Sequence, residues 1–451
     1  MIVLSKWCLK ILTEERRSLL FSWLHGAIPI IPRKLRGIKR SWLAGLFAFG
    51  LILTSTLSWL PAYAGDVVIP SGSQFPPQVK MSQTPVNTEL RGVWLTNIDS
   101  NVLFSKRVLN NALNKLKNLN FNVVYPTIWN WGYTLYPSQV ARKVIGSSVD
   151  PTPGLRRRDM LKEAVELGHK KNLLVIPWFE FGFMAPADSL LAKRHPQWLT
   201  SRRDGNKVWM EGVHKRVWLS PFRPDVQEFI KDLVVEVVKN YDVDGIQVDD
   251  HFGLPSELGY DDYTVALYKQ EHGGKAPPRD NKNPEWVKWR ADKITDFMKE
   301  LFFAIKDVKK DCIVSVSPNP QRFSYEYFLA DWQKWERMGL VEELIIQLYR
   351  NDMNVFTSEM ERPEVQAART HIPVSIGILS GLKRKYVPVK QIQQQVQAVR
   401  DRDFAGVSFF FYETLWNLAK ERPRFRQRGL QKVFSQPAKF PNLLAGWKPQ
   451  R

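Results

Sequence analysis

Carboxylate side chains stand at the ends of several apolar segments of this chain. The adjacent pair Asp249 and Asp250 closes the apolar segment 245–251, and Glu180 closes the apolar segment 173–181. Unpaired acids are costly to bury beside apolar strands, so their placement there favours a functional role. Hydrolysis of a glycosidic bond needs two carboxyl groups, one that donates a proton and one that acts as nucleophile or base. These three acids, together with Glu413, are our candidates for that chemistry.

Amides and aromatic rings accompany the acids at the predicted strand ends. Amides hydrogen-bond sugar hydroxyls, and flat aromatic faces stack on the C–H faces of pyranose rings. The candidate binding residues are Asn97, Trp131, Trp178, Trp209, His251, Asn319, Gln347 and Tyr349. Simple burial in the core remains an alternative for Trp131 and Trp178. Trp209, in the long segment after 173–181, is the best candidate for a stacking platform.

The basic and metal-ligating residue types give weaker signals. His251 stands beside two aspartates, but no second His lies at a ligand spacing, so a hydrogen-bonding role is favoured and no metal site is predicted. Arg202, Arg203, Lys215 and Arg216 flank the long segment around Trp209, and solvation is a sufficient explanation for them.

Eight strand-like segments alternate with helical patterns and must position these side chains. They are 91–97, 121–129, 173–181, 245–251, 312–318, 344–349, 373–379 and 406–412. Their apolar character on both faces is typical of parallel strands covered by helices. Residues 225–241 show a helical apolar face, with Pro224 placed for the first turn. The pattern predicts a (β/α)8 TIM barrel with extended loops after strands two to four. A doubly wound open sheet is the alternative.

Composition excludes several classes for the 451-residue chain. It is 44% hydrophobic and 24% charged, which excludes a wholly disordered protein. Its two cysteines, Cys8 and Cys312, cannot build a disulfide framework. The net charge of +20 favours acidic partners. No basic run is interleaved with aromatic residues, so no nucleic-acid partner is expected. No dinucleotide fingerprint or P-loop is present, so no cofactor is expected.

The first 64 residues are expected to be an export signal. A basic cluster at 33–40 precedes the apolar run 42–60, and Ala62-Tyr63-Ala64 forms a small-x-small cleavage pattern. The apolar run is close to the ~20 residues that span a bilayer, so an uncleaved anchor is the alternative to cleavage. The predicted localisation is periplasmic, cell-envelope or extracellular. The expected organisation continues with a linker at 65–88, the barrel at 89–418 and a basic C-terminal extension at 419–451.

The order of motifs resembles the glycosyl-hydrolase-like family 10, also called the DUF187 glycoside hydrolase family. The similar segments are ELRGVWLTN, NVVYPTIWN with YPS, IPWFEF, WLSPFRPDVQEFI and YDVDGIQVDDHF, within residues 89–416. The resemblance implies a (β/α)8 barrel, export to the envelope and action on glycan strands, which in some members come from peptidoglycan freed of its peptides. It places the family's acid pair on Asp249 and Asp250 and the strand-three acid on Glu180.

We therefore predict an exported glycoside hydrolase that acts on a polysaccharide. Asp250 is the expected nucleophile or base, Glu180 is the expected proton donor, and Asp249 and Glu413 tune or replace them. Only one member of the Asp249–Asp250 pair can face the barrel interior, because neighbouring strand residues point to opposite sides. Strand seven offers no carboxylate, and Asn319 stands where strand five of a related group carries an acid. A non-catalytic glycan-binding barrel and a metal-dependent enzyme using Asp249, Asp250 and His251 are the alternatives.

Overall fold

The central element is an eight-stranded parallel sheet rolled into a barrel. The computed structural model describes residues 88–448, so the predicted signal and nearly all of the predicted linker lie outside the described part. The strand order is β5-β2-β1-β15-β12-β11-β10-β9. The strands are β1 (Leu90–Leu95), β2 (Val123–Pro126), β5 (Leu174–Val175), β9 (Gly245–Asp249), β10 (Ile313–Ser317), β11 (Glu343–Gln347), β12 (Val374–Leu379) and β15 (Gly406–Phe410).

The barrel closes between its third and fourth strands through Trp178. Single bridges join Trp178 to Thr127 on one side and to Gln247 on the other. The third strand is shorter than predicted because Pro177 has no N–H to donate. Its carbonyl still accepts a 2.8 Å hydrogen bond from the Gln247 N–H. This closure confirms the predicted (β/α)8 barrel and removes the open doubly wound sheet as an alternative.

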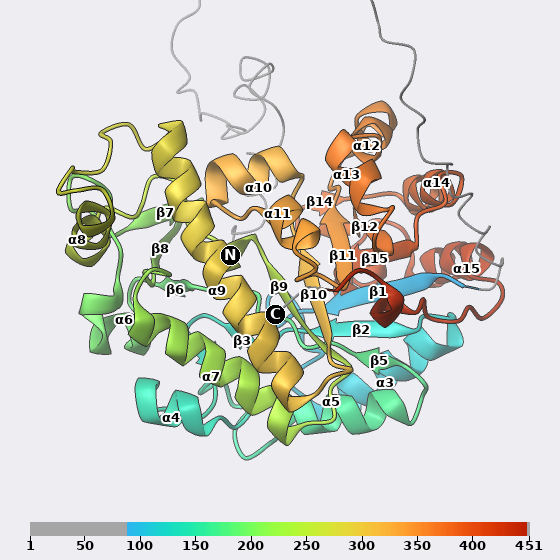
Figure 1. Ribbon diagram of the computed structural model, residues 1–451. Coiled ribbons are helices and arrows are strands. Elements are labelled where there is room, and N and C mark those ends of the chain that lie inside the picture. Colours follow the sequence, from blue (N-terminus) through green and yellow to red (C-terminus); the bar gives the residue numbers. More distant parts are fainter. Residues whose placement is uncertain (1–87, 449–451) are drawn as a thin grey trace, which may run out of the picture. The chain divides into compact units, whose positions relative to one another are not determined.

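Helices surround the sheet (Figure 1). They are α3 (Lys106–Asn118), α5 (Met160–His169), α7 (Pro224–Asn240), α9 (Pro284–Val308), α11 (Trp332–Arg337), α13 (Pro363–Ala368) and α14 (Val389–Arg400). The apolar face predicted from the 225–241 pattern is the buried face of α7, which includes Val226, Phe229 and Leu233. Pro224 occupies the first turn, where its missing N–H has no helical partner to lose.

Further elements are inserted at the carboxyl ends of the strands. Those after β2 and β5 are β3 (Trp129–Asn130), β4 (Tyr133–Thr134), α4 (Gln139–Ile145), β6 (Met184–Pro186), α6 (Leu190–Arg194), η2 (Pro196–Trp198), β7 (Trp209–Glu211) and β8 (His214–Trp218). Those after later strands are η3 (Asp250–Phe252), α8 (Asp262–Glu271), α10 (Gln321–Phe328), α12 (Met353–Met360), β13 (Gly381–Leu382), β14 (Lys385–Tyr386) and η4 (Tyr412–Leu415). The long insertions predicted after strands two to four are therefore present.

The described part of the C-terminal extension packs on the barrel. It contains α15 (Pro423–Val433) and the short turn η5 (Leu443–Ala445). The buried Arg426 donates hydrogen bonds to the carbonyls of Leu415, Val387 and Thr414, at 2.7, 2.7 and 3.0 Å. These bonds fix the start of α15 beside the segments that follow β12 and β15. Between residues 88 and 448, no helix has the length and apolar character needed to cross a bilayer.

A chain of hydrogen bonds crosses the barrel interior. The Trp94 indole N–H donates to Gln247 Oε1 at 2.6 Å, and Gln247 Nε2 donates to Ser315 Oγ at 2.9 Å. Ser315 Oγ in turn donates to Glu343, which also accepts a 3.0 Å bond from the Tyr125 hydroxyl. Burial raises the pKa of Glu343 to about 7, although these two hydrogen bonds favour the ionised carboxylate and by themselves lower the pKa. The polar side chains of this chain, from Trp94 to Glu343, therefore have hydrogen-bond partners inside the barrel.

Candidate active site

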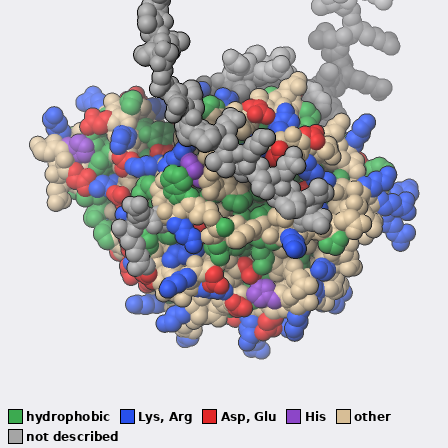
Figure 2. Space-filling view, turned by 45° about the vertical axis from the view of Figure 1, so that its right-hand side comes forward, with side chains coloured by type: hydrophobic (Ala, Val, Ile, Leu, Met, Phe, Trp, Pro, Cys, Tyr) green, Lys and Arg blue, Asp and Glu red, His purple; other side chains and the backbone are tan. Residues whose placement is uncertain are grey.

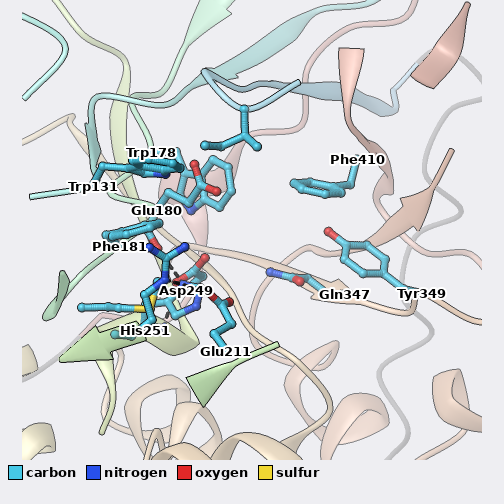
Figure 3. A pocket seen from close by; sticks show the side chains of 13 residues that line it. Trp131, Trp178, Glu180, Phe181, Glu211, Asp249, His251, Gln347, Tyr349 and Phe410 are labelled. Atoms are coloured by element: carbon cyan, nitrogen blue, oxygen red, sulfur yellow. Dashed lines mark hydrogen bonds and ion pairs between the residues drawn. The ribbon is translucent and has the colours of Figure 1, made fainter. Parts of the chain in front are cut away.

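A pocket opens at the carboxyl ends of the barrel strands, where TIM barrels carry their active sites (Figure 3). Its polar lining consists of Glu180, Glu211, Arg216, Asp249, His251 and Gln347, and its aromatic and apolar lining of Ile98, Trp131, Trp178, Phe181, Met184, Tyr349 and Phe410. These residues come from segments far apart in the sequence, between Ile98 and Phe410, so only the closed barrel brings them together. Carboxyl groups and indoles therefore converge as predicted.

Asp249, not Asp250, is the member of the aspartate pair that lines the pocket. Asp249 is the last residue of β9, and its Oδ1 accepts a 2.8 Å bond from the His251 N–H, which caps the 3₁₀ turn η3. Asp250, the first residue of η3, is fully buried and does not line the pocket. Its carboxylate accepts hydrogen bonds from the Asn319 N–H at 3.0 Å, from the Asn319 amide and from Ser324 Oγ at 2.6 Å. The placement of Asp250 thus does not support its expected role as nucleophile.

Glu180 is held beside Asp249 with one oxygen fixed. Its Oε2 accepts hydrogen bonds from Thr127 Oγ1 at 3.1 Å and from Asn130 Nδ2 at 2.7 Å. Burial and the nearby negative charge of Asp249 raise the pKa of Glu180 to about 8, and its two hydrogen bonds only partly oppose this. Glu180 therefore keeps its proton at neutral pH. Figure 3 shows the Glu180 side chain between Trp178 and Asp249.

His251 links the two acids. Its Nδ1 lies 2.7 Å from the Glu180 carbonyl oxygen and 3.1 Å from Asp249 Oδ1. Burial lowers the pKa of His251, but Asp249, Glu211 and Glu180 outweigh burial and raise it to about 9. The His251 ring is thus paired with Asp249, and this pairing orients the Asp249 side chain. His251 has the hydrogen-bonding role that the sequence favoured.

Trp131 stands at the pocket on a tight hairpin. It joins β3 to β4 together with Gly132, and both residues have left-handed backbone angles, φ 57° and 75°. Such a two-residue turn needs φ above zero at both positions, which is uncommon for an aromatic residue. The Trp131 side chain is 40% exposed, in contrast to the buried Trp178. A large exposed indole on a strained turn is suited to stacking on a ligand.

Gln347, Tyr349 and Phe410 form the facing wall (Figure 3). Gln347 is the last residue of β11, and its Nε2 donates a 2.7 Å bond to the Ser317 carbonyl. The Tyr349 ring stacks on Phe410 with centroids 5.5 Å apart. The structure therefore places Trp131, Trp178, His251, Gln347 and Tyr349 in the pocket, as the sequence predicts.

Four other candidates do not line the pocket. Glu413 accepts hydrogen bonds from Ser100 at 3.0 Å and Asn417 at 2.6 Å. Asn319 is fully buried against Asp250, and Trp209 is 7% exposed and packs edge-on against Trp218. Trp209 is buried because β7 folds back on β8, so the sequence segment around it is not an open loop. Asn97 does not line the pocket itself but contacts Asn130, which binds Glu180: the Asn97 Oδ1 accepts a 2.9 Å hydrogen bond from Asn130 Nδ2.

Sequence reasoning missed Glu211 and Arg216, which lie in the pocket as a buried ion pair. Arg216 Nε donates to Glu211 Oε2 at 2.9 Å, and the two side chains are 3% and 6% exposed. The expectation that Arg216 is solvated is wrong, because β8 turns this residue toward the barrel. Thr127 and Asn130, which hold Glu180, were also missed. Their position directly after the second strand was the available signal.

A close backbone approach holds the turn η3 against Glu180. Gly182 has φ +46°, and a Cβ built on it would lie 2.3 Å from the His251 carbonyl oxygen. We expect Gly182→Ala to destabilise the protein by about 2–4 kcal/mol, because backbone must move to relieve the clash. Urea unfolding measures this. Gly205→Ala, where nothing lies within 4 Å of the added Cβ, is the matched control because it has φ +82° without the clash.

Among the described residues, no group of three or more His, Cys, Asp and Glu side chains is arranged to hold a metal ion. The set Asp249, Asp250 and His251 does not converge, because the Asp250 carboxylate is directed toward Asn319 and Ser324.

Comparisons with known proteins agree with this architecture. The pattern of the family described as Glycosyl hydrolase-like 10 matches residues 89–399. The chain is 26% identical over 348 residues to "Glycosyl hydrolase DigH" of Escherichia coli (strain K12), covering 67% of this chain and 74% of that protein. It is 23% identical over 304 residues to "Glycosyl hydrolase YngK" of Bacillus subtilis (strain 168), covering 60% of this chain and 56% of that protein.

Solved structures share the fold at low sequence identity. The PgaB (BpsB) glycoside hydrolase domain from Bordetella bronchiseptica superposes with a TM-score of 0.53 at 15% identity, covering 72% of this chain and 94% of that chain. Alpha-L-fucosidase isoenzyme 2 from Paenibacillus thiaminolyticus superposes with a TM-score of 0.54 at 17% identity, covering 77% of this chain and 49% of that chain. Both similarities are similarities of the barrel fold alone. With the family pattern matching most of the barrel, the chain belongs to the Glycosyl hydrolase-like 10 family.

Proposed function

We propose that this protein is a glycoside hydrolase that cleaves O-glycosidic bonds of a polysaccharide, with Glu180 as proton donor and Asp249 as nucleophile or base. The observation that carries the proposal is the pair of carboxyl groups in one pocket with different environments. Glu180 is buried with a pKa of about 8, whereas Asp249 is paired with His251. Two acids whose environments separate their protonation states are the requirement for acid and base roles in one site.

The contacts of Glu180 support the donor role. Thr127 and Asn130 both donate to Oε2, so the proton resides on Oε1, the other oxygen. From there it passes to the leaving glycosidic oxygen as the bond to the anomeric carbon breaks. Asp249 then either attacks that carbon or removes a proton from the attacking water. The contacts of Asp249 Oδ1 with the His251 ring and backbone N–H keep the Asp249 side chain oriented for this step.

The narrower proposal is that the polysaccharide is the glycan strand of peptidoglycan, reached after export. The motif resemblance and the basic and apolar segments before residue 65 support this location. The net charge of +20 favours an anionic polymer as partner. An anchor formed by residues 42–60 would be the protein's contact with the membrane.

The test is product analysis with the purified full chain. Peptide-free peptidoglycan glycan and neutral plant and bacterial polysaccharides are incubated with the protein, and products are measured by mass. Defined oligosaccharides from the peptidoglycan glycan are expected. Cleavage of a different polysaccharide would contradict the narrower proposal only. Binding without cleavage of any glycan would contradict the hydrolase and favour a non-catalytic binding barrel.

Trp131 and Trp209 should respond differently to truncation. Trp131→Ala is expected to raise KM about tenfold with little change in stability, because a 40% exposed ring loses mainly its ligand contact. Trp209→Ala is expected to destabilise the protein by about 3–5 kcal/mol, because its buried ring leaves a cavity beside Trp218. Steady-state kinetics and thermal unfolding of both variants check this. Equal kinetic losses in both would contradict the placement of Trp131 as a stacking surface.

A further inference from the structure

Arg216 presents a fixed cationic group at the pocket wall. Its Nε bonds Glu211 Oε2 at 2.9 Å, and both side chains are nearly fully buried. The guanidinium carbon lies 5.1 Å from the centroid of the Phe181 ring and 5.6 Å from that of Trp131. An ion pair at one end and two aromatic faces leave the guanidinium little freedom. Its position is therefore set before any ligand arrives.

One edge of this guanidinium is unused. Arg216 Nη2 is buried and has no hydrogen-bond partner among the described residues, and the same holds for the indole N–H of Trp178 in the same pocket. A buried donor without an acceptor costs about 1–3 kcal/mol, more if it is charged. Glu211 and the aromatic rings do not relieve this. The geometry therefore calls for an oxygen acceptor supplied by the ligand.

The charges around the site do not oppose an anionic acceptor. Within the pocket, Glu211 balances Arg216, Asp249 balances His251, and Glu180 holds its proton, so no unpaired carboxylate repels an incoming anion. Guanidinium bonds to carboxylates are about twice as strong as bonds to neutral acceptors and are often bidentate. Arg216 thus has more to gain from a carboxylate than from a hydroxyl.

The surface beside the pocket carries further positively charged side chains. Lys385 and Tyr386 lie on the β13–β14 hairpin, and Lys383 in its turn pairs with Asp99 next to the pocket residue Ile98. The ammonium of exposed Lys420 lies 5.6 Å from the centroid of the Tyr386 ring, and Arg424 and Arg428 are exposed on α15, which follows Lys420 in the chain. Figure 2 shows a group of Lys and Arg side chains at the right-hand edge of the visible face, and Lys, Arg, Asp and Glu side chains mixed over the rest of it. A polymer with repeated negative charges is favoured along such a rim.

We propose that Arg216 determines substrate specificity by binding a carboxylate substituent of the sugar ring that stacks on Trp131, so that the substrate is an acidic glycan. This inference rests on the proposed glycan-cleaving function and narrows its substrate class. The shared chemistry is a ring-borne carboxylate, which occurs on the lactyl ether of muramic acid and at C6 of uronic acids. Glu211 acts as a positioning residue that holds the guanidinium edge toward the pocket.

Binding to an inactive protein tests this separately from cleavage. The Glu180→Gln full chain is titrated with peptide-free peptidoglycan strands, with the same strands after carboxyl reduction, and with oligogalacturonate and its reduced form. We expect a carboxylated ligand to bind about ten- to a hundredfold more tightly than its reduced counterpart, as one charge-assisted pair provides. The pair of ligands that shows the preference identifies the source of the carboxylate.

Variants assign the preference to Arg216. Adding Arg216→Gln should reduce the ratio of the two affinities to about one. Arg202→Gln, which removes a partly exposed arginine of the same insertion that pairs with Glu257, should keep the ratio. Because Arg216→Gln leaves Glu211 buried without its partner, the double change Glu211→Gln with Arg216→Gln provides a second, uncharged version of the site.

Two results would overturn the inference. One is equal affinity of the parent for carboxylated and reduced ligands in both pairs. The other is a preference that survives in both Arg216 variants while they remain folded by circular dichroism. The proposed function fails independently, if the unmodified protein cleaves no glycan even though the binding preference and its loss are observed.

Discussion

Replacing Glu180 with Gln is expected to lower kcat for glycan cleavage by about 10²–10⁴-fold, the usual contribution of a positioned acid. Gln accepts the hydrogen bonds of Thr127 and Asn130 through its own oxygen, but it has no transferable proton. KM should change much less, because the shape of the pocket is kept. Steady-state kinetics on the cleaved glycan measure both constants. The matched control is Glu413→Gln, since Glu413 bonds Ser100 and Asn417 outside the pocket.

The pH profile tests the same assignment. The protonated form of Glu180 is the active one, so kcat should fall as pH rises through about 8, the pKa of this carboxyl. The residual activity of Glu180→Gln should lack this alkaline limb. A profile of the variant that keeps the limb would transfer the donor role to another group.

The stability of the fold should depend on the same carboxyl group and should fall over the same rise in pH. Because burial raises the pKa of Glu180, the folded state binds more protons than the unfolded state between its ordinary pKa and about 8. The free energy of unfolding therefore falls as pH rises through that window and is low above it. Glu180→Gln removes the titration and should be more stable than the parent at pH 9, by a margin on the order of 1–3 kcal/mol. Urea unfolding at pH 5 and pH 9 measures the difference.

Asp249→Asn and Asp250→Asn should separate catalysis from stability. Asp249→Asn is expected to lower kcat by about a thousandfold or more, because the amide is neither a nucleophile nor a base for this reaction. The variant should also lose some stability, because buried His251 loses its charged partner, so activity is compared per folded molecule. Kinetics and thermal unfolding on the same preparations compare the two effects.

Asp250→Asn should mainly weaken the fold. Asp250 accepts three hydrogen bonds from Asn319 and Ser324, and the amide would direct an N–H at one of those donors. A loss of about 2–4 kcal/mol of unfolding free energy is expected, from buried donors left unsatisfied. Activity per folded molecule should fall far less than for Asp249→Asn. An Asp250→Asn protein of normal stability without activity, beside an active Asp249→Asn protein, would restore Asp250 as the nucleophile.

The two aspartates show what a local sequence pattern can predict and what it cannot. Strand alternation predicts that Asp249 and Asp250 face opposite sides, and this does not depend on the rest of the fold. Which of them faces the pocket depends on neighbours far along the chain. Asn319 and Ser324 follow β10 and receive Asp250, whereas His251 and the turn η3 keep Asp249 at the pocket.

The sequence by itself determined the barrel and the rim on which the chemistry lies. The eight apolar segments and helical faces are local patterns, and carboxyl ends of parallel strands meet at one edge whatever the details. This is why the sequence predicts Glu180, Gln347, Tyr349 and Trp178 at this rim. The family motifs can be recognised for the same reason, because each of them coincides with a predicted strand or its flanking segment.

Only the tertiary structure decided which polar groups share the pocket. Arg216 and Trp209 lie on paired strands of one hairpin and are register partners, yet Arg216 lines the pocket and Trp209 does not. No property of either residue type predicts this, since it depends on how the hairpin packs on the barrel. The raised pKa of Glu180 is equally a tertiary property. It arises from burial and from Asp249, which lies on another strand and is brought close only when the barrel closes.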